Sequence, residues 1–395
     1  MNKLGKAGAC SLMAVACLTI MVGCVIVPGL PNIAKNLNVP HLASWLVTLP
    51  SLGVVIFGAP VGNLMKRIGA YRVLLAGLAL YGALGVIGMW LANPIVLFAD
   101  RLILGGATAM VMASGTALIS EFYHGDERLK MIALQGMSIE LGGVIFLAIG
   151  GIFAQMHWQL PFILYLMAWV FLVGILLFVP KPANRSDAES IANADATPSV
   201  AQGKGRGNVA IVYFAACLTM VLFFTAVIMM PRFLAKLGLS EDQTGYFMAF
   251  ISLVAVGAAS QMPKIQRRFG SIMTLCIAFI GYAIAHFLYS TGVIELMILG
   301  AIFMGIGFGF SVPLVNHMVV ECSTNAYRNQ NLAMLSVAIF LGQFLSSFMS
   351  FIPGDGAMTF IVAGIAAIVI SAFFLTQRLV KKSSNPSLSE TNTGS

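Results

Sequence analysis

The sequence predicts an all-α membrane protein in which twelve transmembrane helices form two pseudo-symmetric six-helix bundles. Three observations lead to this fold class. The 395-residue chain is 59% hydrophobic and only 9% charged, with a mean hydropathy of +0.93, whereas about a quarter of the residues in a soluble domain are charged. Apolar segments of about 20 residues, long enough to cross a bilayer, recur along the chain. Finally, the second half repeats residues of the first at a constant offset.

Twelve apolar segments are the expected spans, and polar or basic connections separate them. An even number of spans places both ends of the chain on one side of the membrane. The segments lie approximately at residues 8–30, 43–64, 71–92, 95–119, 130–154, 158–179, 208–230, 243–263, 271–292, 295–318, 331–352 and 357–377.

Lysine and arginine predict the orientation, because cytoplasmic connections carry an excess of these residues. Alternate connections hold 18 of the 22 cations, the other set holds only Lys35, Arg232 and Lys236, and Arg101 lies within a span. We therefore expect both termini in the cytoplasm and the chain in the cytoplasmic (inner) membrane. The cations of the richer set are Lys3, Lys6, Lys66, Arg67, Arg72, Arg128, Lys130, Lys181, Arg185, Lys204, Arg206, Lys264, Arg267, Arg268, Arg328, Arg378, Lys381 and Lys382.

The chain divides into two halves joined by one long polar connection. Residues 1–180 form the first predicted bundle, and residues 208–378 form the second. Residues 181–207 are rich in Ala, Ser, Asn, Asp and Gly and predict a flexible cytoplasmic linker. We expect the polar tail, residues 379–395, to be disordered.

An internal repeat relates the two halves at an offset of 200 to 201 residues. The segment Ala-Cys-Leu-Thr at 16–19 recurs at 216–219. Six helices per repeat give both bundles the same orientation around an axis normal to the membrane. Further pairs are Pro31 with Pro231, Leu37 with Leu237, Arg67 with Arg268, Gly69 with Gly270, Tyr81 with Tyr282, Glu121 with Glu321, Arg128 with Arg328 and Gly142 with Gly342.

Several classes of function are excluded by what the sequence lacks. The net charge of +8 lies in short connections, so it predicts topology and not nucleic-acid binding. No glycine-rich phosphate loop and no His/Cys cluster with zinc spacing is present. We expect no enzyme, no metal and no cofactor. The expected partners are the lipid bilayer and a small-molecule substrate, and we expect a monomer driven by the proton gradient.

A basic turn connects the second and third spans. Gly62 and Gly69 permit a tight turn, and Lys66, Arg67 and Arg72 hold it in the cytoplasm. These cations either set the topology alone or form a charged latch that gates the cytoplasmic side. The second half repeats the turn with Arg267, Arg268 and Gly270, and Glu121 in the next cytoplasmic connection is a candidate partner for the latch.

Charged residues inside two spans are the candidates for proton and substrate binding. Arginine at mid-span costs roughly 2.5–3.5 kcal/mol on insertion scales, so Arg101, next to Asp100, either faces a cavity or extends to the outer surface. Thr108 and Met112 follow on its face. Glu140, near the midplane, must be paired or protonated. Glu140 is therefore a candidate proton carrier, together with Asp100. Alternatively, Glu140 forms a static ion pair with Arg101, or an ion pair that breaks when Glu140 is protonated.

The second half offers polar and aromatic candidates for the cavity. Asn316 and His317 follow Pro313, which loosens the tenth span. A histidine in such a position either titrates near neutral pH or is a hydrogen-bonded structural residue. Phe223 represents the many Phe and Met side chains, which suit either varied apolar ligands or lipid-facing packing.

These motifs resemble the major facilitator superfamily over nearly the whole chain. Gly62, Leu64, Arg67 and Gly69 match its loop signature glycine-x-leucine-x-aspartate-arginine-x-glycine, in which Lys66 replaces the aspartate. In the family that acid helps to lock the two halves on the cytoplasmic side. The resemblance therefore implies that another acid, such as Glu121, takes the place of the missing aspartate in the latch.

Three further motifs are similar to those of the proton-coupled drug antiporters with twelve helices. Arg101-x-x-x-Gly105 resembles their fourth-helix signature, and Pro28-Gly-Leu-Pro31 resembles the end of their first helix. Residues 150–151 match the last two glycines of their fifth-helix motif, although residues 146–147 are Phe-Leu where the family has glycine-proline. The resemblance implies a cavity lined by spans 1, 4, 7 and 10 and alternating access by rocking bundles.

Three functions are compatible with these residues and motifs. The first is proton-coupled efflux of small amphipathic or drug-like molecules, with the proton on Glu140, a response from Arg101 and gating by the basic turns. The second is uptake or exchange of a specific polar or anionic metabolite, bound by Arg101, Asn316 and His317. The third is a non-transporting membrane sensor. Direction of flux separates the first two, and loss of transport on Glu140→Gln separates both from the third.

Overall fold

The computed structural model describes residues 4–181, 209–324, 327–354 and 356–383. The described chain is helical, and twelve of its helical segments are long and apolar enough to cross a membrane. The predicted fold class is confirmed. The expected linker lies outside the described residues except for Lys181. Of the expected disordered tail, residues 379–383 continue the last helix and the rest lies outside the described residues.

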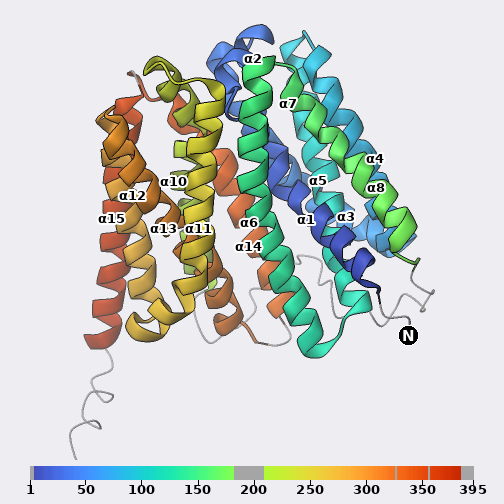
Figure 1. Ribbon diagram of the computed structural model, residues 1–395. Helices are drawn as coiled ribbons and strands as arrows, with labels where there is room; N and C mark the ends of the chain where they lie inside the picture. Colours follow the sequence, from blue (N-terminus) through green and yellow to red (C-terminus); the bar gives the residue numbers. More distant parts are fainter. Residues whose placement is uncertain (1–3, 182–208, 325–326, 355, 384–395) are drawn as a thin grey trace, which may run out of the picture.

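The first half contains α1 (Lys6–Cys24), α2 (Leu30–Asn36), η1 (Pro40–Leu42), α3 (Ala43–Ile68), α4 (Ala70–Ile87), η2 (Gly88–Trp90), α5 (Pro94–Phe122), α6 (Gly125–Met156), α7 (Leu160–Ile163), η3 (Leu164–Leu166) and α8 (Met167–Phe178). The second half contains α10 (Val209–Lys236), α11 (Glu241–Phe269), α12 (Ser271–Ser290), α13 (Ile294–Cys322), α14 (Arg328–Leu345), η4 (Ser346–Phe351) and α15 (Ala357–Ser383). The start of α1 and the end of α15 lie at the same end of the bundle (Figure 1).

Two single-residue turns connect long antiparallel helices at that end of the bundle. Gly69 joins α3 to α4 with φ 84° and ψ 151°, and Gly270 joins α11 to α12 with φ 81° and ψ 161°. Only glycine adopts this region readily. The basic turn predicted over residues 62–72 is therefore much shorter in the structure, because α3 continues to Ile68 and α4 begins at Ala70. We call this end of the bundle the hairpin side and the opposite end the far side.

The first span is also shorter than predicted. The sequence suggests one helix over 8–30, but α1 ends at Cys24 and α2 begins at Leu30. Pro28 and Pro31 explain the break, because proline has no backbone N–H and restricts the residue before it. Pro31 occupies the first turn of α2, where a missing N–H costs nothing.

Glycines set equivalent close contacts in the two halves. A Cβ atom at Gly142 in α6 would lie 2.9 Å from the Cβ of Cys17 in α1, and one at Gly342 in α14 would collide with the carbonyl oxygen of Cys217 in α10. Small residues let helices approach closely in lipid, where apolar surface alone does not drive association. The sequence repeat therefore corresponds to a repeat of helix packing.

Candidate functional site

A narrow cavity of about 30 Å³ lies between the two halves of the protein. From the first half, α1 and α6 supply Ile20, Cys24, Glu140, Gly143 and Leu147. The second half contributes side chains from α10, α11 and α13. The 32-residue helix α6 has Glu140 near its centre, so the cavity lies at about the middle of the bundle.

Among the residues that the structure describes, Glu140 is the only charged one that lines this cavity. Its side chain is partly buried, and within the described part of the chain it has no hydrogen bond or ion pair. An isolated carboxylate in an apolar site is costly unless it is neutralised by a proton or a cation.

Aromatic and sulfur-containing side chains cover the opposite wall. The rings of Phe223 in α10 and Phe308 in α13 stack with centroids 3.9 Å apart, and Phe224 packs edge-on to Phe223 at 5.6 Å. Met230 and Met248 complete this wall. Such side chains accommodate apolar and aromatic ligands of varied shape. The cavity thus has a carboxylate on one half and an apolar, partly aromatic lining on the other.

The two halves are joined at the far side of the cavity by neutral hydroxyl groups. Ser44 in α3 lies 3.1 Å from Ser350 in η4, Oγ to Oγ, and one helical turn deeper Thr48 contacts Ser347. The backbone N–H of Glu241 in α11 donates to the side-chain oxygen of Gln155 in α6 at 3.2 Å. Figure 1 shows α6 and α11 close together at the far side and diverging toward the hairpin side.

Glycines allow this contact between α6 and α11. A Cβ atom at Gly151 would lie 2.9 Å from the Cα of Gly245, and one at Gly245 would lie 2.6 Å from the carbonyl oxygen of Leu147. Leu147 itself lines the cavity. The far-side contact between α6 and α11 therefore begins at the cavity wall itself.

Cysteines at Ser44 and Ser350 are expected to lock the far side closed. The two Oγ atoms are 3.1 Å apart, so the thiols of cysteines at these positions would lie near enough to react with each other. Oxidation of the Ser44→Cys/Ser350→Cys protein should remove nearly all transport, and reduction should restore it. The single variants are the controls. Full transport by the cross-linked protein would show that these residues need not separate.

Arg101 is completely buried inside the first half and is paired with its neighbour Asp100. Its Nη2 and Nε atoms donate to Asp100 Oδ2 at 2.7 and 3.1 Å. Nη2 also donates to the carbonyl oxygens of Leu84 and Gly85 in α4 at 3.0 and 3.3 Å. The suggested ion pair with Glu140 is not found, because this nearer carboxylate and the α4 carbonyls hold the guanidinium.

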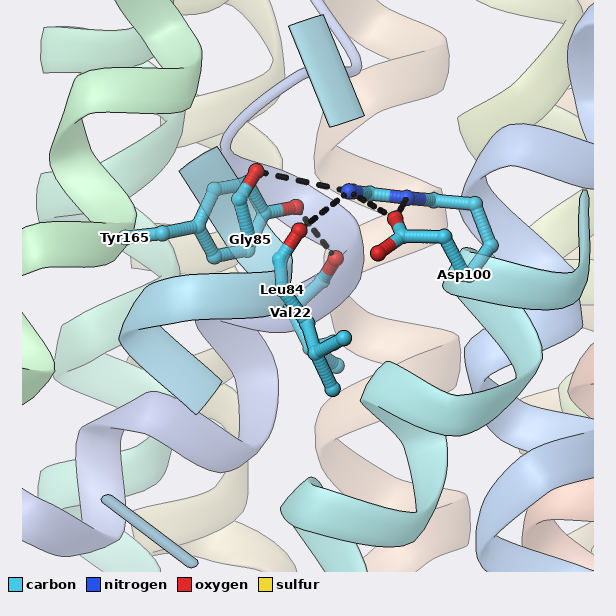
Figure 2. Close-up of polar contacts among 6 residues, drawn as sticks. Val22, Leu84, Gly85, Asp100 and Tyr165 are labelled. Carbon is cyan, nitrogen blue, oxygen red and sulfur yellow. Dashed lines mark hydrogen bonds and ion pairs between the residues drawn. The ribbon is translucent and has the colours of Figure 1, made fainter. Parts of the chain in front are cut away.

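Aromatic rings complete the surroundings of Arg101. Its guanidinium carbon lies 5.6 Å from the ring centres of both Phe162 and Tyr165, and the hydroxyl of Tyr165 donates to the carbonyl oxygen of Val22 in α1 at 2.8 Å. Figure 2 shows Tyr165, Val22 and Asp100 gathered in this group. We call Asp100, Arg101, Tyr165 and the carbonyls of Leu84, Gly85 and Val22 the arginine cluster.

Of the six residues predicted to line the substrate cavity, the cavity includes Phe223. Arg101 lies in the arginine cluster. The hydroxyl of Thr108 donates to Leu104 O within α5, and Met112 packs beside the small core cluster near Val61.

The other two predicted cavity residues lie toward the hairpin side. Asn316 is exposed and donates to Val312 O at 2.9 Å. His317 is 45% exposed, with Nδ1 3.4 Å from Glu321 Oε2. Asn316 and His317 lie on α13, a helix that does line the central cavity, but their own side chains are not part of the lining.

The predicted gating residues lie together at the hairpin side. Lys66 and Arg67 end α3, Arg267 and Arg268 end α11, and cations at the carboxyl end of a helix are favoured by its dipole. Gly62 and Arg72 lie in the helices that flank the first turn, Gly69 and Gly270 form the turns, and Glu121 lies near the end of α5.

The sequence analysis did not predict the contacts of Ser44 and Thr48 with Ser350 and Ser347, which we call the hydroxyl seam, or the contact of Tyr165 with Arg101. Spacing offered a signal for the seam, because Ser44 and Thr48 are four residues apart and Ser347 and Ser350 are three apart, so each pair shares a helix face. Nothing local connects Tyr165 with Arg101, since 64 residues separate them and only the packing of both η3 and α5 against α4 brings them together.

Comparison with known proteins gives one family match and several distant relatives. The family model described as Major Facilitator Superfamily matches residues 12–347. The chain is 30% identical to the cephamycin export protein CmcT of Amycolatopsis lactamdurans, over 34% of this chain and 28% of that protein. It is 28% identical to the probable multidrug-efflux transporter Rv1634 of Mycobacterium tuberculosis, again over 34% and 28%.

Another relative is named as a symporter and not as an exporter. The chain is 29% identical to the arabinose-proton symporter of Escherichia coli, over 40% of this chain and 34% of that one. The matches thus span about a third of the length of the curated relatives. Among solved structures, a mutant of the nucleoside transporter NupG aligns with a TM-score of 0.77 at 12% identity, covering 93% of this chain and 99% of that chain. The inward-open xylose transporter XylE from E. coli gives 0.70 at 17%, covering 93% and 95%.

Proposed function

Because the chain belongs to the Major Facilitator Superfamily and is therefore a secondary transporter and not an enzyme, we propose that it exports small amphipathic cations in exchange for protons. The observation that carries this proposal is the composition of the central cavity. Glu140 supplies one negative charge, no Lys, Arg or His of the described chain lines the cavity, and the remaining lining is mainly apolar. A cation with an apolar body satisfies both features at once.

Exchange follows if proton and substrate compete for Glu140. In the state closed at the far side, the cation displaces the proton and its apolar part packs on the wall formed by Phe223, Phe224 and Phe308. The halves then rock, the seam at Ser44 opens, and a proton from the far side replaces the cation. Because either species neutralises the carboxylate, the unpaired charge need not cross the apolar middle of the bundle.

The direction of transport rests on the orientation. With the basic turns in the cytoplasm, as the lysine and arginine bias predicts, the far side is external, and the contact between Ser44 and Ser350 supports a state that loads substrate from the cytoplasm. The basic turns then gate that side. The names of two relatives, a cephamycin export protein and a probable multidrug-efflux transporter, support export.

The alternative, uptake or exchange of a polar or anionic metabolite, has less support in the geometry. Its expected binding residues were Arg101, Asn316 and His317, and none of them lines the central cavity. Arg101 is bound to Asp100, and Glu140 would repel an anion. The site therefore favours a cation.

Two ions of the same shape and opposite charge test the proposal. Tetraphenylphosphonium and tetraphenylborate are added to the purified protein in weak buffer, and binding and proton release are followed together. We expect saturable binding and proton release with the phosphonium and neither with the borate. Equal binding of both ions, or phosphonium binding without proton release, would contradict the proposal. Accumulation of the phosphonium in proteoliposomes that are acidic inside, with the hairpin side facing out, tests the direction.

A further inference from the structure

We propose that Arg101, held in place by Asp100, is a positioning residue that fixes helix α1 as one wall of the central cavity. In this role it neither binds the substrate nor carries the proton. Because the role concerns the shape of the cavity, it does not depend on the direction of transport or on the identity of the substrate. Three structural steps lead from the guanidinium to the cavity.

The first step is that the guanidinium is held on several sides. Asp100 accepts two hydrogen bonds from it, and the carbonyls of Leu84 and Gly85 accept two more. These carbonyls lie near the carboxyl end of α4, where the helix dipole favours a cation. A Cβ atom at Gly88 would collide with Arg101 Nη2, so this glycine leaves the space that the guanidinium fills.

The second step is that the guanidinium of Arg101 contacts Tyr165, whose hydroxyl group binds α1. The ring centre of Tyr165 lies 5.6 Å from the guanidinium carbon. Its hydroxyl donates to Val22 O at 2.8 Å (Figure 2). Tyr81 lies beside it, with ring centres 5.8 Å apart, and donates to Leu18 O at 2.7 Å. Two hydroxyl groups thus hold two carbonyls of α1 that are one helical turn apart.

The third step is that the opposite face of α1 lines the cavity. Two residues along an α-helix correspond to a rotation of about 200°, so the side that carries Leu18 and Val22 is opposite to the side that carries Ile20 and Cys24. Both Ile20 and Cys24 line the cavity that contains Glu140. The arginine cluster therefore holds α1 from behind and sets its height and rotation at the cavity.

Asp100 has a matching role in the cluster. The carboxylate and the guanidinium are both buried and together are neutral. An arginine left alone at this depth would be an uncompensated buried charge. Asp100 then serves to keep Arg101 in place, and the proton cycle can proceed through Glu140 without it.

The reactivity of Cys24 tests the proposal, because this thiol lies on the cavity face of α1. The rate of alkylation by N-ethylmaleimide is measured in purified protein that retains Cys24 as its single cysteine. Tyr165→Phe removes only the hydroxyl that holds Val22 O. Loss of one buried hydrogen bond corresponds to about a threefold to tenfold change in equilibrium, and we expect the alkylation rate to rise by about that factor because α1 moves more freely.

Tyr289→Phe is the matched control. Tyr289 is a completely buried tyrosine of the second half whose hydroxyl has no hydrogen-bond partner among the described residues. Its removal should leave the alkylation rate of Cys24 within about twofold of the parent. Equal rates in the parent and in Tyr165→Phe, or an equal increase in both phenylalanine variants, would overturn the proposal.

Arg101→Lys separates positioning from a role in proton transfer. Lysine keeps the charge but lacks the planar fork that reaches both Asp100 and α4. We expect faster alkylation of Cys24 and weaker binding of tetraphenylphosphonium, with an unchanged pH midpoint of proton release. A shifted midpoint with unchanged alkylation would place Arg101 in the proton path and contradict the proposal. If the phosphonium releases no proton from any variant, the proposed exchange fails, whereas the alkylation rates still test the positioning.

Discussion

Replacement of Glu140 by glutamine is expected to abolish the proton release that tetraphenylphosphonium causes and to stop proton-driven transport. Glutamine has nearly the same size, so the packing against Gly143 and Leu147 is retained while the titratable group is lost. Removal of a charged partner costs about 2–3 kcal/mol or more in binding, which corresponds to about a 30- to 150-fold weaker affinity for the cation. Isothermal titration in two buffers of different ionisation enthalpy measures both quantities.

Glu295→Gln is the control for that experiment. Glu295 lies exposed in the first turn of α13 and does not line the cavity. Its replacement should leave cation affinity and proton release unchanged. Because the Glu140→Gln substitution removes an unpaired charge from an apolar site, it should not lower the stability of the fold. Persisting proton release in Glu140→Gln would show that another group carries the proton.

The second large effect is expected from Asp100→Asn, which should destabilise the first half by about 3–5 kcal/mol. The substitution leaves the guanidinium of Arg101, which is 0% exposed, without its carboxylate. Arg101 Nη1 already lacks a hydrogen-bond partner in the described chain, so the cluster has little capacity to compensate. Unfolding by titration with a denaturing detergent, followed by circular dichroism, measures the loss.

The double variant Asp100→Asn/Arg101→Gln should recover most of that stability, because it removes both charges together. Arg67→Gln is the matched control on an exposed arginine at the end of α3 and should change stability by less than about 0.5 kcal/mol. A double variant that is less stable than Asp100→Asn would show that the ion pair is not the source of the loss.

Much of the fold could be predicted from the sequence because its signals are local. Hydropathy located the twelve spans, and the offset of 200 to 201 residues located the repeat that the packing of Cys17 on Gly142 and Cys217 on Gly342 reproduces. The errors lie at ends of segments. The α1 helix stops before Pro28, and α3 continues to Ile68, because caps and prolines set such boundaries and hydropathy does not.

The candidate site was predictable only in part. A carboxylate at the centre of a span is unusual enough to be recognised alone, and Glu140 does line the cavity. Arg101 is equally unusual in the sequence, yet it is enclosed by α4, α5 and η3. Depth along a helix follows from residue number, whereas the direction of a side chain depends on how the helix is rotated.

Composition, length and the position of a residue along a span are properties of the chain, and they were enough to identify a membrane protein of two repeated halves with an acid at its centre. Three groupings needed the folded structure: Asp100 with Arg101, Ser44 with Ser350, and Phe308 with Glu140 in the lining of one cavity. Each helix satisfies its own backbone hydrogen bonds. Its rotation and its neighbours are therefore set by close packing between helices, which the sequence of one helix does not specify.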